Sequence, residues 1–203
     1  MRIVYLHGFA SGPGSKKAAY FRQRFSEQGI ELEVPDLTGG DFEHLTISGQ
    51  LRILEETARG EPVRLIGSSL GGYTSALYAA HHPEVDSLIL MAPAFNFLER
   101  WRQRLGPETM ESWKNSDGLP IQSYVDGEIR RLHYGFMQDG EKYEPFPDFH
   151  QPAIVFHGRA DDIVPPEYSI DFARRHPNVE LHLVDSNHEL LNVLDHIWNA
   201  IPS

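Results

Sequence analysis

Residues 62–78 of the chain read PVRLIGSSLGGYTSALY and combine three features in a short space. An apolar, β-branched run ends abruptly at Gly67, and an alanine-rich, helix-compatible stretch follows the glycines. A strand, a glycine-flanked serine and a helix, in this order, form the setting of a nucleophile elbow, a strained turn that pushes the serine hydroxyl clear of the backbone. Gly67 and Gly71 flank Ser69 where such a turn leaves no room for a side chain. We therefore predict that Ser69 is a nucleophile.

The same stretch allows a second interpretation. A turn rich in glycine and serine at the N-terminus of a helix can also cradle a phosphate. The loop at residues 8–17 is glycine-rich as well, but Pro13 stands where a phosphate-binding loop needs its second glycine. We therefore expect no nucleotide site. The nucleophile interpretation requires a histidine and a carboxylate further along the chain.

The composition is that of a soluble protein with one domain, residues 1–203. Of its 203 residues, 40% are hydrophobic and 23% are charged, which suffices for a substantial core. The net charge of −11 argues against nucleic acid or an anionic membrane as a partner. The chain has no cysteine, so disulfides and thiolate metal sites are excluded. We see no signal peptide and no membrane-spanning segment, and we expect a cytoplasmic protein with no membrane insertion.

Apolar runs that suit buried strands alternate with helical patterns along most of the chain. Around the elbow unit at 62–78, strands are expected at 2–6, 30–34, 87–91, 153–156 and 179–184, and helices at 16–28, 46–59, 166–175 and 189–200. This alternation predicts a minimal, doubly wound α/β fold, in which a mostly parallel sheet carries helices on both faces.

Residues 94–151 break the alternation. This segment has many aromatic residues and short helical patterns but no convincing strand. It is too short for a second domain and too apolar for a linker, so we interpret it as an insertion packed over the sheet, where it would serve as a lid. Its aromatic residues could line an acyl pocket or hold the lid together. Its arginines, including Arg100, Arg102, Arg104, Arg130 and Arg131, could meet an anionic substrate group or remain solvated.

The partners that Ser69 needs follow later strands. Catalytic groups gather at the carboxyl ends of parallel strands, and His188 lies in the short loop after the last one, so it is the expected base. Asp161 and Asp162 both follow the strand at 153–156, and either could orient the imidazole. We favour Asp161 and keep Asp162 as the alternative. The chain order Ser, Asp, His is that of α/β hydrolases.

An oxyanion hole completes the expected site. Its backbone N–H donors should be those of Leu70, the residue after the nucleophile, and of Phe9, in the loop after the first strand. Gly8 should let that loop approach closely. His7 should tie the loop down through hydrogen bonds, with no part in proton transfer.

With these residues in place, the chain resembles an α/β hydrolase, and more narrowly the small bacterial esterases of the UPF0227 family. The similarity rests on YLHGF at 5–9, Ser15-Lys16-Lys17, GSSLGGY at 67–73, MAPAF at 91–95 and SNH at 186–188. The stretch HGRADDIVP at 157–165 also resembles the acid loop of carboxylesterases, which favours Asp161. The resemblance implies about six parallel strands, with the first strand inside the sheet. It also implies hydrolysis of carboxylic esters or thioesters without a cofactor.

The sequence thus predicts a serine hydrolase that cleaves small-molecule or acyl esters through an acyl-enzyme on Ser69, with no metal and no cofactor. Acyl-CoA thioesterases and C–C hydrolases use the same triad, and a binding module without catalysis could share the fold. The sequence does not specify the acyl group or the oligomeric state.

Overall fold

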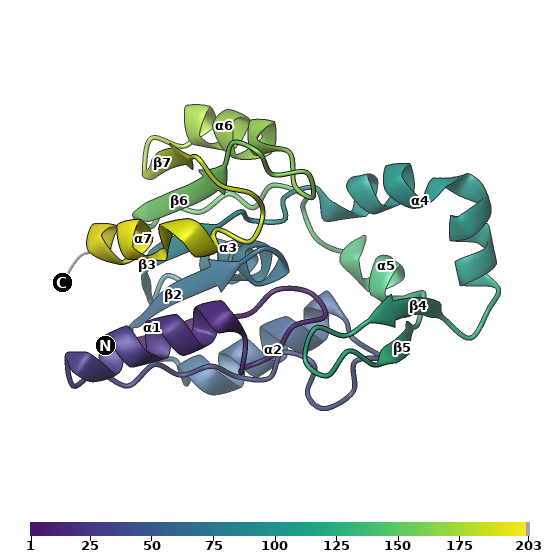
Figure 1. Cartoon of the computed structure of the whole chain (residues 1–203), viewed down its shortest axis with the longest axis horizontal. Coiled ribbons are helices and arrows are strands. Elements are labelled where there is room, and N and C mark those ends of the chain that lie inside the picture. Colours follow the sequence, from purple (N-terminus) through teal and green to yellow (C-terminus); the bar gives the residue numbers. More distant parts are fainter. Residues whose placement is uncertain (202–203) are drawn as a thin grey trace.

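A computed structural model describes residues 1–201. The centre of the molecule is a five-stranded sheet, which Figure 1 shows with helices around it. All neighbouring strands are parallel. Their order across the sheet is β1-β2-β3-β6-β7, for β1 (Arg2–Leu6), β2 (Val63–Ser68), β3 (Val85–Met91), β6 (Ala153–Gly158) and β7 (Val179–Val184). The mostly parallel sheet that the alternation predicts is therefore confirmed.

Helices cover both faces of this sheet, and each face has a separate apolar core between the sheet and its helices. Helices α1 (Lys16–Glu27) and α7 (Leu194–Ala200) lie together on one face, in front of the sheet in Figure 1. Helices α2 (Ile47–Ala58), α3 (Leu70–His81) and α6 (Pro166–Arg175) contribute to the core of the opposite face. β-branched and leucine side chains alternate between these two cores along the strands, which is why the strands read as continuous apolar runs.

The expected strand at 30–34 is reduced to a single bridge between Glu33 and Val4. The amide of Tyr5 donates to Glu33 O and the amide of Glu33 donates to Ile3 O, but no ladder continues beyond them in the described residues. Pro35, which has no N–H group, follows almost at once. The sheet thus has five strands where about six were expected. The prediction of an interior first strand is wrong, since β1 lies at the edge of the sheet.

The closing helix is also shorter than the expected 189–200. Leu190 has a left-handed backbone conformation, with φ of 58°, which an α-helix does not accommodate. A single 3₁₀ turn at Leu191–Val193 follows, and α7 begins only at Leu194. The apolar stripe of the sequence is real, because Leu190, Leu194 and Ile197 are all buried.

The insertion lies beyond the arrowheads of β2 and β6, at one end of the sheet (Figure 1). It contains α4 (Phe97–Lys114), the antiparallel hairpin of β4 (Leu119–Gln122) and β5 (Ile129–Leu132), and α5 (Gly135–Gly140). Helix α4 is kinked at Gly106, where φ is 74°, and Pro107. The expectation of no strand in this segment is wrong. The strands escape a sequence pattern because each has four residues, one contains Pro120 and the other adjacent arginines.

Among the described residues, no helix combines the length and apolarity that crossing a membrane requires.

Candidate active site

Ser69 occupies a strained turn between β2 and α3. Its backbone has φ of 53° and ψ of −116°, a conformation that non-glycine residues rarely adopt. Its amide donates to Met91 O on the neighbouring strand, and its carbonyl accepts from Tyr73 in α3 and from Ala94. The surrounding structure thus holds the strained residue in place from the strand side and from the helix side.

The two flanking glycines are required by space. A Cβ at Gly67 would lie 2.5 Å from both Gly71 O and Ser75 Oγ, and a Cβ at Gly71 would lie 2.5 Å from His7 O. Real side chains do not approach backbone oxygens so closely. The elbow helix therefore packs against β1 and β2 at a distance that only glycine permits.

Gly71→Ala is expected to destabilise the fold by about 3 kcal/mol, because its Cβ would collide with the backbone after β1, which cannot move without disturbing the sheet. Urea unfolding followed by circular dichroism measures the change. Gly14→Ala is the matched control, since a Cβ at Gly14 has no neighbour within 4 Å. Equal stability of the two variants would contradict the steric argument.

The loop after β7 brings His188 to the elbow. Its Nε2 lies 3.1 Å from Ser69 Oγ, and its Nδ1 lies 2.7 Å from Asp161 Oδ2. Because an ionised carboxylate can only accept, the proton belongs on Nδ1, and Nε2 is left to accept from the serine hydroxyl. The three side chains, which come from three loops at the carboxyl ends of β2, β6 and β7, therefore form one continuous chain of hydrogen bonds.

Asp161 accepts four hydrogen bonds. The amides of Ile163 and Val164 donate to Oδ1, while His188 and His157 meet Oδ2. Burial raises the pKa of this carboxyl, but the hydrogen bonds from His157, His188 and Val164 outweigh burial and lower the pKa well below its usual range. Asp161 is therefore ionised whenever His188 needs an acceptor. Asp162, the alternative from the sequence, is exposed.

His157 is a member of this network that the sequence analysis left without a role. It is completely buried at the end of β6, and its Nε2 donates toward Val164 O at 2.9 Å and Asp161 Oδ2 at 3.1 Å. Its Nδ1 accepts from Ser169 Oγ at 2.8 Å. His157 thus orients the carboxylate that orients His188. The spacing of four residues between His157 and Asp161, directly after a buried strand, is the signal that could have revealed it.

Two contacts hold the His188 loop against the rest of the molecule. A Cβ at Gly158 would lie 2.5 Å from Asn187 O, so the loop passes over β6 where only glycine fits. Lys17 Nζ donates to Glu189 O at 2.8 Å from the start of α1. Burial lowers the pKa of Lys17 to about 8, although the charges of Glu189 and Asp161 oppose that shift. Lys17, at the start of α1, therefore anchors the histidine loop.

Two amides are free at the site. Leu70 is the first residue of α3, so its N–H has no acceptor within that helix. In the loops and turns of residues 1–201, neither this N–H nor that of Phe9 donates to a backbone carbonyl. The Phe9 ring packs against Phe42, Trp101 and Phe136, with centroid distances of 5.6, 5.1 and 5.7 Å. Trp101 and Phe136 belong to the insertion. The insertion therefore fixes the loop that carries the Phe9 amide.

The same loop is held at two further points. Ala10 O accepts from the amide of Tyr124 in the turn between β4 and β5, at 2.7 Å. His7 Nε2 accepts from the amide of Leu37 at 3.1 Å, and its Nδ1 donates to Gly8 O. Burial lowers the pKa of His7, which keeps its ring neutral in this arrangement. A Cβ at Gly8 would meet Ser68 O and Ser69 Cβ at 3.5 Å, an ordinary contact, so packing alone does not require glycine there.

Four of the five arginines named from the sequence of the insertion are engaged within the protein, while Arg104 is exposed. Arg100 Nη1 donates to Ile163 O at 2.6 Å, Arg102 pairs with Glu141 at 2.6 Å, and Arg130 pairs with Asp126 at 2.5 Å. Arg131 donates to Gly118 O. The aromatic residues of the insertion pack on one another and on Phe9, so they hold the insertion together.

A cavity of about 330 Å³ lies between α3 and the insertion. Ser69, His188 and Asp161 are not among the residues that line it. Its walls include Tyr73, Phe97, Leu98, Arg102 and Tyr143.

Comparisons with known proteins agree with this architecture. The model of the uncharacterised protein family UPF0227 matches residues 2–202. The palmitoyl-protein thioesterase ABHD10 of cattle (Bos taurus) is 26% identical over 95% of this chain and 68% of its own length. The monoacylglycerol lipase abhd6-B of Xenopus laevis is 24% identical over 80% of this chain and 49% of its own length. The structure of mouse α/β hydrolase domain-containing protein 10 superposes with a TM-score of 0.80 at 24% identity, covering 97% of this chain and 86% of that one.

Proposed function

The chain belongs to the UPF0227 family and, with its thioesterase and lipase relatives, to the α/β hydrolases of the ester-cleaving class, and on that premise we propose that it is a serine esterase acting on acyl esters or thioesters. One observation carries the proposal. A serine in a strained elbow, a histidine and a buried, ionised aspartate are linked at 3.1 and 2.7 Å in the order that nucleophilic acyl transfer needs.

Catalysis begins when Ser69 Oγ attacks the carbonyl carbon while His188 Nε2 takes the serine proton. Asp161 holds the imidazole in the required tautomer and stabilises its positive charge. The amides of Leu70 and Phe9 donate to the oxygen that becomes negative, and the position of Leu70 at the N-terminus of α3 adds the helix dipole.

Collapse of the tetrahedral intermediate breaks the bond to the leaving group. His188 gives its proton to the departing alkoxide or thiolate, and the acyl group remains on Ser69. A water molecule then attacks this acyl-enzyme while His188 Nε2 accepts a proton from it. Return of that proton to Ser69 Oγ releases the carboxylic acid and regenerates the enzyme.

The proposal includes thioesters as substrates because the thiolate that leaves from a thioester needs little stabilisation by the site. A thiolate is more stable than an alkoxide, so proton donation by His188 is less critical for a thioester. The cattle relative, named a palmitoyl-protein thioesterase, supports the inclusion of an acyl chain on the substrate. A ligand-binding protein without catalysis is the competing hypothesis, and it does not require an ionised aspartate behind a histidine that contacts the serine hydroxyl.

A fluorophosphonate probe distinguishes the two hypotheses, because it reacts with an activated serine and not with an inert one. We expect stoichiometric labelling at Ser69, located by mass spectrometry of the digested protein. In parallel, initial rates are measured with p-nitrophenyl butyrate, p-nitrophenyl palmitate and palmitoyl-CoA. Hydrolysis of at least one of these acyl donors is expected. Absence of labelling together with absence of hydrolysis would exclude a serine esterase.

A further inference from the structure

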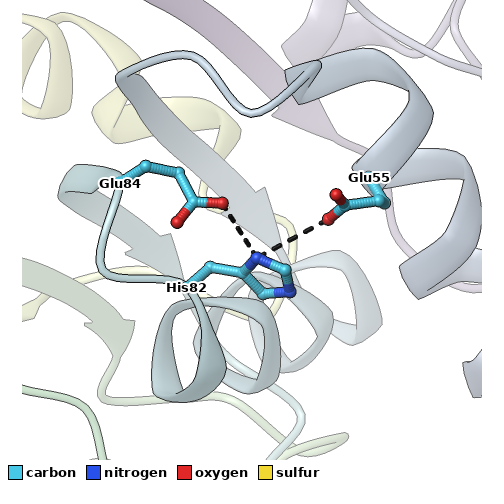
Figure 2. Close-up of side chains that lie close together, drawn as sticks. All are labelled: Glu55, His82 and Glu84. Atoms are coloured by element: carbon cyan, nitrogen blue, oxygen red, sulfur yellow. Dashed lines mark hydrogen bonds and ion pairs between the residues drawn. The ribbon is translucent and has the colours of Figure 1, made fainter.

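A second group of reactive side chains lies at the opposite end of the elbow helix. Glu55 of α2, His82 directly after α3 and Glu84 before β3 direct their side chains to one point, as Figure 2 shows. His82 Nδ1 lies 2.9 Å from Glu84 Oε1 and 3.5 Å from Glu55 Oε2. Helix α3 has 12 residues and separates this cluster from Ser69 by about 18 Å. The cluster takes no part in the chemistry proposed for Ser69.

We propose that Glu55, His82 and Glu84 form a binding site for a divalent transition-metal ion of the Zn²⁺ type. One imidazole nitrogen and two carboxylates are ligands that Zn²⁺ accepts, and the nitrogen favours it over Ca²⁺ or Mg²⁺. Two ligands at about 2.1 Å from a tetrahedral ion lie about 3.4 Å apart. The two distances from Nδ1 lie on either side of this value, and all three ligand atoms are within 4.8 Å of one another.

Tyr78 contacts and orients two of the three proposed ligands, His82 and Glu55. Its buried ring is stacked on the His82 imidazole, with a centroid distance of 3.7 Å and an angle of 3° between the planes. Its hydroxyl donates to Glu55 Oε2 at 2.8 Å. A group that donates a hydrogen bond to a ligating carboxylate is a usual support of a metal site, and the stacked ring restricts the orientation of the imidazole.

The electrostatics at this point favour a cation. The site lies at the C-terminus of α3, where the helix dipole is negative. The carboxylates of Glu55 and Glu84 both face His82 Nδ1 at this terminus. Two carboxylates and a helix terminus therefore act together at one place.

The backbone around the ligands is fixed by hydrogen bonds. His82 O accepts from Gln151 Nε2, at the end of the insertion, and from the amide of Val85. Glu84 O accepts from the amide of Val63, where β2 begins. An ion bound here would thus connect α2, the end of α3 and the start of β3, and would stabilise the native state by its binding free energy.

The competing explanation is an ion pair alone, in which a protonated His82 bridges the two glutamates. The test uses the full chain, stripped with EDTA and dialysed, and titrates it with ZnCl₂ by calorimetry, with Co²⁺ as a spectroscopic substitute. We expect one site whose affinity for Zn²⁺ falls at least 10-fold in His82→Gln and in Glu84→Gln. The midpoint of thermal unfolding should rise with Zn²⁺ in the wild type and in neither variant.

His81→Gln is the matched control, because His81 adjoins His82 but is exposed and lies 3.8 Å from a single carboxylate, that of Glu144. It should bind Zn²⁺ like the wild type. If no Zn²⁺ binds, or if His82→Gln and Glu84→Gln bind as tightly as His81→Gln, the proposal is overturned, and the histidines elsewhere on the surface account for any uptake. Hydrolysis of p-nitrophenyl butyrate should be equal before and after EDTA, which separates this site from Ser69.

Discussion

Ser69→Ala is expected to lower kcat/KM for p-nitrophenyl butyrate by roughly 10⁴-fold to 10⁶-fold, the loss seen when a serine nucleophile is removed from a triad. The loss is large because the hydroxyl that forms the acyl-enzyme is gone, and within residues 1–201 Ser69 is the hydrogen-bond partner of His188 Nε2. Alanine accepts the strained backbone no worse than serine does, so the fold should persist. Steady-state kinetics and fluorophosphonate labelling measure the effect.

Ser68→Ala is the matched control, since Ser68 precedes Ser69 in the same elbow and is buried at the end of β2. It should keep most of the activity and should still be labelled by the probe. Both variants should match the wild type in circular dichroism. A Ser69→Ala protein that turns over ester at the wild-type rate would exclude the proposed mechanism.

Asp161→Asn is expected to reduce kcat by about 10³-fold to 10⁴-fold, with a small effect on KM. The substitution replaces the charge that stabilises the imidazolium of His188. It also replaces an oxygen that faces two N–H donors, from His157 and His188, by either a neutral oxygen or an NH₂ group. An NH₂ group at that position would force His188 to carry its proton on Nε2. A protonated Nε2 cannot accept the proton of Ser69.

Asp162→Asn provides the control for charge, because it removes the same charge one residue away from an exposed side chain. Its kcat should equal that of the wild type. If Asp162→Asn lost activity and Asp161→Asn did not, Asp162 would be the carboxylate that orients His188. Rate measurements at several pH values add a second readout, because only the Asp161 variant should change the pH dependence that the histidine imposes.

Much of the architecture follows from local patterns. The elbow stretch at 62–78 predicts its own strand, turn and helix, and the structure places β2, Ser69 and α3 there. Alternation of apolar runs with helical stripes predicts the parallel sheet, and the match of UPF0227 to residues 2–202 agrees with the family inferred from the motifs. These features depend on residues that are close together in the sequence, so a local sequence pattern can predict them.

The errors occur where long-range geometry overrides a local pattern. Residues 30–34 alternate like a strand, yet only Glu33 reaches β1. The hairpin of the insertion is too short for a detectable pattern and forms because Trp113 donates to Leu132 O and the β4–β5 turn bonds to Ala10. The role of Phe9 is similar, because its ring is held by aromatic residues that follow it by more than 90 positions or lie in a separate loop.

The fold class, the elbow with its two glycines and the candidate roles of Ser69, His188 and Asp161 can be inferred without a structure, because each depends on a short motif or on the order of motifs. Three contacts become visible only in the folded molecule: that of Asp161 with His188, that of His157 with Asp161, and that of Glu55 with His82 and Glu84. A side-chain contact requires atoms within about 3 Å, and packing of the sheet and its helices, not distance along the chain, sets which side chains come that close.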